Sequence, residues 1–262
     1  MKNILITNDD GIFAYGLKAL VDEISKLGKV IVVVPDRERS AVSNTLTLMN
    51  PVRITQGGYP TYCRFEKNTY ICDGTPADCV RFGVIMLHDK KPDLVISGIN
   101  YGGNLGQDVI YSGTVGAARE SIILGIPSIA VSLVTKTGKH FGTAAKICRK
   151  TAEYILKNRK MKQENNELFF NINVPDVPMS KIRGIKFTQL GKRKYSDSIE
   201  KRYDPYGLPY YWLKGKVLPF HANANTTDVV SVQQNFVSIT PLKLDITDTG
   251  MLTRLNNNSI PL

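Results

Sequence analysis

Short oxygen-bearing side chains cluster in three segments of the sequence, each directly after an apolar stretch. The segments are 8–11, 35–40 and 98–104. In the first, Asp9 and Asp10 are adjacent carboxylates, which raise each other's pKa unless a positive charge lies beside them. Carboxylate, hydroxyl and amide oxygens form a hard ligand set that suits Mg²⁺, Mn²⁺ or Ca²⁺ better than Zn²⁺. Because Asn-Asp-Asp-Gly also favours a turn, these four residues alone leave a turn and a metal site equally open.

Glycines and hydroxyl side chains mark a second candidate feature, an anion site. The stretch 97–106 lets the backbone come close to a ligand, which favours a functional site over a plain turn. It leads into 111–116, where Ser112 or Thr114 can cap a helix whose first N–H groups would bind an anion. An ordinary N-cap that binds nothing is the alternative. A dication beside such a helix N-terminus indicates phosphoryl chemistry with metal-bound water as the nucleophile, while attack by an aspartate through an aspartyl-phosphate stays open.

Other catalytic schemes fit the sequence poorly. It holds no P-loop, no G-x-S-x-G elbow, no H-E-x-x-H zinc motif and no dinucleotide fingerprint G-x-G-x-x-G. The histidines His88, His140 and His221 are scattered, which favours surface or loop positions over metal ligation. A Cys–His nucleophile pair stays open, but no cysteine lies in the glycine-rich segments.

The elements expected around these segments alternate between strand and helix. Near-continuous apolar strands alternating with helices are typical of an α/β protein whose parallel sheet is covered on both faces. Ligands bind such a sheet beyond the carboxyl ends of its strands, so the three segments should meet at one edge. The expected strands are 4–7, 30–34, 93–97, 128–133 and 168–172, and the expected helices are 17–27, 76–87, 115–124 and 144–157. Gly28 can end the first of these helices, and Thr75 followed by Pro76 is typical of an N-cap that opens the second.

The second half of the chain predicts hairpins and loops rather than further strand–helix units. Residues 181–202 hold eight basic and two acidic residues, and 204–213 combine prolines and a glycine with aromatic side chains. Exposed aromatic protrusions are often oligomer contacts, with a small local core as the alternative. We therefore expect a catalytic core over 1–180. For the remaining residues, 181–262, an oligomer contact and a small local core both stay open at this point.

Composition sets the class of protein. The 262 residues are 42% hydrophobic and 22% charged, which is ordinary for a globular chain and excludes a collagenous or wholly disordered one. The net charge of +11 favours anionic partners such as phosphates, nucleic acid or a membrane surface. No signal-peptide core or membrane-spanning apolar run is present, and the four cysteines form no C-x-x-C pair. We expect a soluble, cytoplasmic protein with reduced thiols.

Several motifs together resemble the survival protein SurE family of metal-dependent nucleotidases, over most of the chain. They are 4–11 (ILITNDDG), 35–48 (PDRERSAVSNTLTL), 73–79 (DGTPADC), 93–106 (DLVISGINYGGNLG), 108–118 (DVIYSGTVGAA), 204–213 and 237–242 (VSITPL). Several motifs in the right order are far more specific than any one of them. Two local departures are Ser121, where the family usually has glycine after the glutamate, and a threonine within 225–228, where glycine is more frequent.

This resemblance implies a Rossmann-like, three-layer core and hydrolysis of nucleoside 5′- and 3′-monophosphates, with some activity on short-chain polyphosphate. It also implies one divalent ion per subunit, Mg²⁺ or Mn²⁺. Residues 181–262 should then form a C-terminal β-hairpin and helix arm that joins subunits into homodimers or homotetramers, followed by a return to the core. The metal ligands it carries over are Asp9, Asp10, Ser40 and Asn100, and we assign catalytic roles to Asp9, Asp10 and Asn100. The substrate-contacting residues it carries over are Ser43, Asn104, Ser112, Gly113 and Thr114.

The resulting hypothesis is a cytoplasmic, metal-dependent phosphomonoesterase that acts on nucleoside monophosphates and has no membrane partner. The alternative is a nucleic-acid-binding protein that uses the basic segment 181–202. Against this alternative, the sequence holds no recognisable reader motif, and its aromatic residues are not interleaved with the basic ones as stacking platforms require. A solvated basic face that draws anionic substrate to the site explains the same charges.

Overall fold

The computed structural model describes residues 1–57, 68–86, 90–158, 168–218 and 226–256. At its centre is a nine-stranded sheet in the order β3-β4-β2-β1-β5-β6-β7-β11-β8. The strands from β4 to β7 in this order are parallel, whereas β3 is antiparallel to β4 and β11 to β7. The predicted mostly parallel sheet is confirmed. Its strands are β1 (Lys2–Thr7), β2 (Gly28–Pro35), β3 (Ile54–Gln56), β4 (Thr69–Cys72), β5 (Leu94–Tyr101), β6 (Ser128–Val134), β7 (Phe169–Pro175), β8 (Ile185–Phe187) and β11 (Val237–Pro241).

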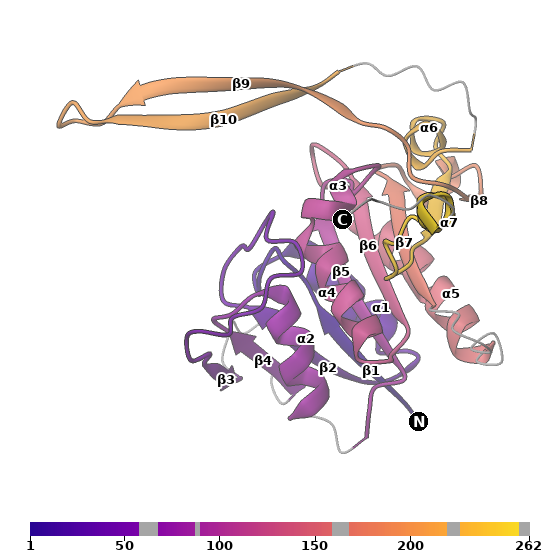
Figure 1. The fold of residues 1–262 in the computed structure, drawn as a ribbon. Coiled ribbons are helices and arrows are strands. Elements are labelled where there is room, and N and C mark those ends of the chain that lie inside the picture. Colours follow the sequence, from indigo (N-terminus) through magenta and orange to yellow (C-terminus); the bar gives the residue numbers. More distant parts are fainter. Residues whose placement is uncertain (58–67, 87–89, 159–167, 219–225, 257–262) are drawn as a thin grey trace.

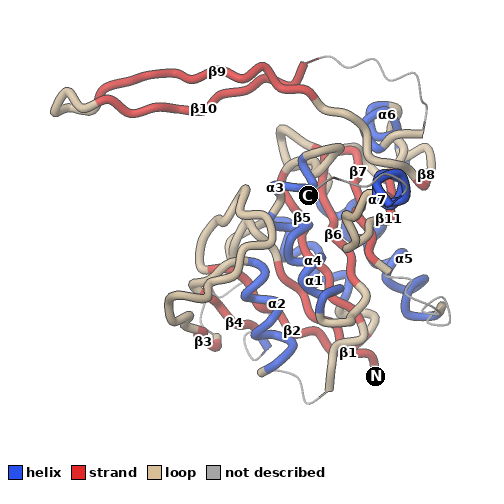
Figure 2. The backbone as a smooth tube through the Cα atoms, in the orientation of Figure 1, coloured by secondary structure: helices blue, strands red, loops and turns tan. Residues whose placement is uncertain are grey.

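Helices cover both faces of this sheet and give it three layers (Figure 1, Figure 2). Ile4 and Ile6 of β1 pack into one apolar cluster with two of the helices, α1 and α5, whereas Leu5 packs into another with α2 and α4. Successive side chains of a strand point to opposite faces, so two covered faces require the continuous apolar runs found in the sequence. None of the helices in the described ranges is long and apolar enough to cross a membrane. The helices are α1 (Tyr15–Ile24), α2 (Pro76–Ile85), α3 (Asp108–Tyr111), α4 (Gly113–Ile123), α5 (Phe141–Lys157), α6 (Asp228–Gln233) and α7 (Thr249–Asn256), with a 3-10 turn, η3, at Met179–Lys181.

The start of α2 follows the local sequence closely. Thr75 Oγ1 accepts a hydrogen bond from the Asp78 amide at 3.1 Å, and Asp78 Oδ2 accepts one from the Thr75 amide at 2.9 Å. This reciprocal capping box, with Pro76 as the first helical residue, confirms the predicted helix start. The expected end of this helix near Leu87 lies outside the described residues, as do Cys63, His88 and His221.

The expected ends of one helix and one strand are wrong, because contacts with residues distant in the sequence determine them. Helix α1 ends at Ile24, and Gly28 begins β2 instead of closing the helix. Gly28 pairs with Lys2 in the parallel ladder, where a Cβ would lie 2.2 Å from the Lys2 carbonyl oxygen. Strand β5 continues to Tyr101, beyond its expected end, with a register shift against β6 between Gly98 and Asn100. Part of the glycine-rich segment is therefore strand rather than loop.

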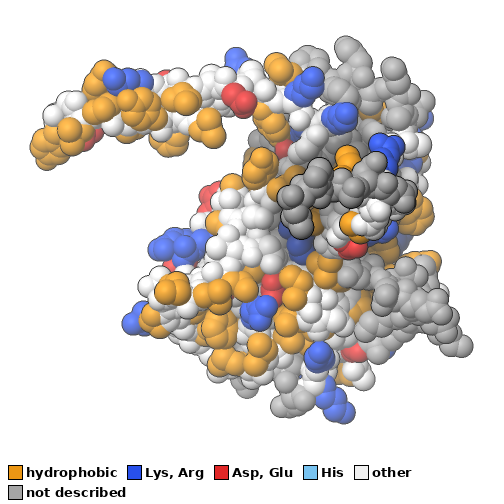
Figure 3. All heavy atoms as spheres, in the orientation of Figure 1, with side chains coloured by type: hydrophobic (Ala, Val, Ile, Leu, Met, Phe, Trp, Pro, Cys, Tyr) orange, Lys and Arg blue, Asp and Glu red, His pale blue; other side chains and the backbone are white. Residues whose placement is uncertain are grey.

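Residues from the basic and aromatic half of the chain form a long two-stranded arm that projects from the body (Figure 1). Its antiparallel strands are β9 (Lys194–Tyr203) and β10 (Pro209–Leu218). Apolar side chains run along this arm in the space-filling view (Figure 3). After the arm, β11 returns to the central sheet between β7 and β8. The predicted hairpin in the second half is confirmed.

The close approach of α1 to the sheet gives a test of the fold. A Cβ on Gly16 would lie 2.2 Å from the carbonyl oxygen of Ile99, whereas Gly142, also the second residue of its helix, has no atom within 4 Å of such a Cβ. We expect Gly16→Ala to lower the free energy of unfolding by about 1–3 kcal/mol through overpacking. Gly142→Ala should leave it unchanged or raise it by up to about 1 kcal/mol. Urea denaturation measures both, and equal effects of the two substitutions would contradict the packing described.

Candidate functional site

The sheet order reverses between β1 and β5, and the candidate site lies at the carboxyl ends of these two strands. From β1 the chain continues to β2 on one side, and β5 joins β1 on the other. Asp9 and Asp10 follow β1, and Asn100 is the second-last residue of β5. Open α/β sheets bind ligands in the crevice formed at such a reversal. The fold therefore brings the first and third polar segments together, as the parallel sheet predicts.

Asp9 is buried and held by the first turn of α4. Its Oδ2 accepts a hydrogen bond from the Thr114 amide at 3.0 Å, and its Oδ1 accepts one from the Thr114 hydroxyl at 2.5 Å. Ser112 caps the same helix, because its Oγ accepts from the Val115 amide at 3.0 Å. Gly113 leaves the space that this approach needs, since a Cβ there would lie 3.0 Å from Asp9 Oδ2. The amide of Thr114, expected to contact phosphate, thus binds the protein's own carboxylate.

Asp10 is held from the neighbouring strand. Its Oδ2 accepts a hydrogen bond from the Tyr101 amide at 3.0 Å, which joins the end of β1 to the end of β5. The Asn100 side chain donates from Nδ2 to the carbonyl oxygen of Gly102 at 2.8 Å. With Nδ2 used in this way, Oδ1 is the atom of the Asn100 amide that remains to accept a donor or to bind a cation.

The electrostatics of the two carboxylates disfavour their charged forms. Burial raises the pKa of Asp9 to about 7; hydrogen bonds from Thr114 act against this rise, and the charge of Asp10 adds to it. Burial also raises the pKa of Asp10, with a further increase from the charge of Glu38. In the ranges that the structure describes, no Lys, Arg or His forms an ion pair with either carboxylate. A cation beside the two carboxylates would favour their charged forms and so lower both pKa values.

The loop after β2 lies against the same carboxylates. The Arg39 amide donates to the Asp9 carbonyl oxygen at 2.7 Å. Ser40 is the next residue, so its backbone is held beside the site by this hydrogen bond. In this structure the Ser40 hydroxyl is exposed and donates to Glu38 Oε1 at 2.7 Å. Ser43, with a φ of 54°, donates from its amide to the Tyr111 carbonyl at 2.8 Å and from its hydroxyl to the Ile110 carbonyl at 2.7 Å. Both serines therefore lie near the site, each with a protein partner.

A buried glutamate, which sequence reasoning missed, fixes this loop to α4. Glu120 is fully buried; its Oε2 accepts from Asn44 Nδ2 at 2.9 Å, and its Oε1 lies 2.7 Å from Arg81 Nε. The Thr47 amide donates to Asp78 Oδ1 at 3.0 Å and fixes the far end of the loop to α2. These contacts join residues far apart in the sequence, so no local pattern could have predicted them.

Asn104 belongs to a buried polar network beside the carboxylates. Its Nδ2 donates to Ser132 Oγ at 2.9 Å, and its amide donates to Asn173 Oδ1 at 2.9 Å. The side chains of Asn171 and Asn173 both donate to its carbonyl oxygen at 2.9 Å. Ser132 pairs with Asn100 across β5 and β6, so this network adjoins the site. The sequence signal for it was two asparagines at alternate positions of the apolar strand β7.

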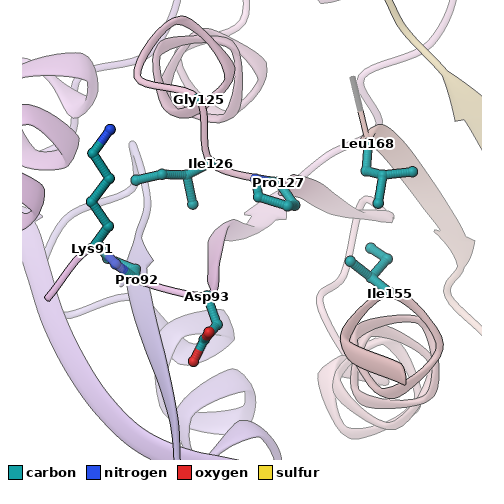
Figure 4. A pocket seen from close by; sticks show the side chains of 8 residues that line it. All are labelled: Lys91, Pro92, Asp93, Gly125, Ile126, Pro127, Ile155 and Leu168. Carbon is teal, nitrogen blue, oxygen red and sulfur yellow. The ribbon is translucent and has the colours of Figure 1, made fainter. Parts of the chain in front are cut away.

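A separate pocket lies at the opposite edge of the sheet, where β5, β6 and β7 begin (Figure 4). Its two charged side chains already have protein partners. Lys91 donates to the Leu124 carbonyl at 3.2 Å, and Asp93 Oδ2 accepts from the Asn3 amide at 2.7 Å. Because ligand sites of such sheets lie at the carboxyl ends of the strands, this pocket is not the candidate site.

Comparison with known proteins shows which family this chain resembles in sequence and in fold. The family model described as survival protein SurE matches residues 4–197. A protein of Natranaerobius thermophilus named 5′-nucleotidase SurE is 44% identical, with 97% of each chain covered. One of the same name from Legionella pneumophila is 43% identical, covering 97% of this chain and 96% of that protein. The crystal structure of the SurE protein from Aquifex aeolicus matches with a TM-score of 0.80 and 40% identity, covering 97% of this chain and 98% of that one. The chain belongs to the survival protein SurE family.

Proposed function

We propose that this chain hydrolyses nucleoside 5′- and 3′-monophosphates to nucleoside and phosphate with the help of one divalent cation, Mg²⁺ or Mn²⁺. The nucleotidase names of its relatives support the reaction. The observation on which the proposal rests most is the pair of acids at the end of β1. Asp9 is buried beside Asp10 and has a raised pKa, and no ion pair with a described cationic side chain offsets its charge.

The side chains at this edge fit a hard dication. Asp9 and Asp10 supply the charge, and the Ser40 hydroxyl and Asn100 Oδ1 supply neutral oxygens, the ligand types that Mg²⁺ and Mn²⁺ prefer. Within the described ranges no three His, Cys, Asp or Glu side chains gather as a metal cluster, so further ligands would be neutral oxygens. When bound, a dication neutralises charge on the phosphoryl oxygens and lowers the pKa of water.

The chain's own groups orient the reactants. Thr114 fixes both oxygens of Asp9, and the Tyr101 amide fixes Asp10, so the two carboxylates need not reorganise when substrate binds. The N-terminus of α4, with Ser112 as its N-cap and Gly113 as its first residue, directs the positive end of the helix dipole toward the carboxylates. In this proposal Ser112, Gly113 and Thr114 line the phosphate position, and Ser43 and Asn104 border it.

We also propose that the enzyme is cytoplasmic and that short-chain polyphosphate is a second substrate. Cys72, Cys79 and Cys148 are free and buried, which is typical of a reducing compartment and supports a cytoplasmic enzyme. Short-chain polyphosphate presents the same terminal phosphoryl group and is included as a substrate. Nucleic-acid binding by 181–202 is not favoured, because Arg193 and Arg202 of this segment pair with Asp108 and Glu200.

The arm supports a second part of the proposal, a homodimer or homotetramer in which residues 181–262 provide the subunit contact. The pairing of β9 with β10 places Ile199 opposite Leu213 and Lys201 opposite Tyr211 on one face. Ile199 is 71% exposed and Leu213 81% exposed, so the described part of the chain leaves this apolar pair largely uncovered. A lone two-stranded ribbon is marginally stable in water, and a second subunit would cover its apolar face.

Substitution of the acids tests the cation site. We expect Asp9→Asn and Asp10→Asn each to reduce phosphate release from AMP by at least about a thousandfold, because several kcal/mol of charge stabilisation is lost. Mn²⁺ at a hundred times its Kd should stabilise the wild-type chain by about 2.7 kcal/mol, and neither variant should respond. Asp22→Asn, which changes an exposed acid of α1 paired with Lys18, is the control. Wild-type turnover in either site variant would show that the assignment is wrong.

Thr114 gives a finer test of how Asp9 is held. Thr114→Val keeps the amide and the shape of the side chain but removes the hydroxyl donor, and should weaken Mn²⁺ binding by roughly 10- to 100-fold. Thr114→Ser keeps the donor and should stay close to the wild-type value. Calorimetric titration of Mn²⁺ measures both, and equal affinities of the valine and serine variants would rule out this positioning role.

The arm is tested by adding charge to one face of it at a time. We expect Leu213→Asp to shift the chain toward monomers in sedimentation velocity, because a carboxylate would be buried in the apolar contact. Ser198→Asp adds the same charge to the other face of the same ribbon and should leave the assembly intact. Dissociation by both variants, or by neither, would argue against this face as the contact.

A further inference from the structure

Tyr101 holds an exposed aromatic ring beside the carboxylates. Its amide donates to Asp10 Oδ2 at 3.0 Å, and it directly follows Asn100 in β5. Bond lengths of about 1.5 Å place the ring centre within roughly 9 Å of the Asp10 carboxylate. In a nucleoside monophosphate about six covalent bonds separate phosphorus from the base, which is a comparable reach. The ring therefore lies within the reach of the base of a substrate whose phosphate is held at these carboxylates.

The ring of Tyr101 is fixed by its neighbours. Its hydroxyl donates to the Lys136 carbonyl oxygen at 2.6 Å. Gly138, in the same loop after β6, lies so close that a Cβ there would be 2.7 Å from the tyrosine Cε2 atom. Phe141, the first residue of α5, packs against it with ring centroids 6.4 Å apart. A ring that is already ordered loses little conformational entropy when a flat ligand packs on it.

This fixed ring still faces solvent. Tyr101 is 51% exposed, although its backbone lies in a central strand of the sheet. Two more exposed aromatic side chains are Phe13, at 56%, on the segment between Asp10 and α1, and Tyr15, at 86%, the first residue of α1. The first turn of α1 packs on the end of β5 through Gly16 and Ile99, so that segment and Tyr101 border the same side of the carboxylates.

We propose that Tyr101 is the platform on which the nucleobase of the substrate stacks. This inference rests on the proposed function and adds to it a means of recognising the base. Stacking uses the π-face that every base has and reads no hydrogen-bonding edge, so it tolerates base identity. The chain should therefore hydrolyse all common nucleoside monophosphates, purines better than pyrimidines because they present the larger face, and all of them better than a phosphomonoester without a base.

The experiment compares AMP with ribose 5-phosphate, which has the same phosphate and sugar but no base. The measured quantity is the ratio of kcat/KM for AMP to kcat/KM for ribose 5-phosphate. Tyr101→Leu keeps an apolar side chain of similar bulk but removes the ring, and we expect the ratio to fall roughly tenfold, with most of the change in KM for AMP. Tyr101→Phe keeps the ring and should preserve most of the ratio. Tyr154→Leu removes a similarly exposed tyrosine of α5 and is the matched control.

A second measurement does not depend on turnover of a nucleotide. Adenosine should inhibit hydrolysis of ribose 5-phosphate competitively, and Tyr101→Leu should raise its inhibition constant by a similar factor. If Tyr101→Leu lowers activity on both substrates equally and leaves adenosine inhibition unchanged, the ring acts only on the geometry of the site and the inference is overturned. If the wild-type chain releases phosphate from neither substrate, the proposed function itself fails.

Discussion

A buried carboxylate with a second carboxylate directly beside it, at the end of β1, is the constraint around which this edge of the molecule is arranged. Asp9 is removed from water and Asp10 lies next to it, so the ionised pair is unfavourable unless something positive joins it. The parallel sheet positions the pair at its order reversal, between strands that are covered on both faces. The polar edge of the sheet is thus held rigidly by an apolar core that makes no contribution to the chemistry itself.

Helix α4 links the separate parts of this edge. Its first turn binds Asp9 through Thr114, and two turns later Glu120 binds Asn44 in the loop that carries Ser40 and Ser43. One rigid helix therefore sets the position of the carboxylate relative to the serine loop. Glu120 is itself buried and paired with Arg81 on α2, and removing one member of such a pair leaves an uncompensated charge. Stability and positioning depend on the same contacts here.

The sequence predicted the elements well where the physical cause is local, and less well where it is distant. Continuous apolar runs predicted the parallel strands because both sheet faces are covered, and Thr75 followed by Pro76 predicted the start of α2 because a cap needs only near neighbours. Gly28 was assigned to a helix end because its real role depends on Lys2, a strand partner far away in the sequence. The meeting of the polar segments at one edge was predicted because parallel strands all end at the same edge of the sheet. The partners of Thr114, Asn44 and Asn104 depend on three-dimensional packing and had no local signal.

The most direct test of this account is a crystal structure of the chain grown or soaked with Mn²⁺, with anomalous scattering used to locate the ion. We expect one manganese peak per subunit in contact with Asp9 and Asp10, with Ser40 and Asn100 supplying neutral oxygens and Thr114 still bonded to Asp9. A manganese-containing crystal with no peak at these carboxylates, and with their side chains turned apart into solvent, would contradict it.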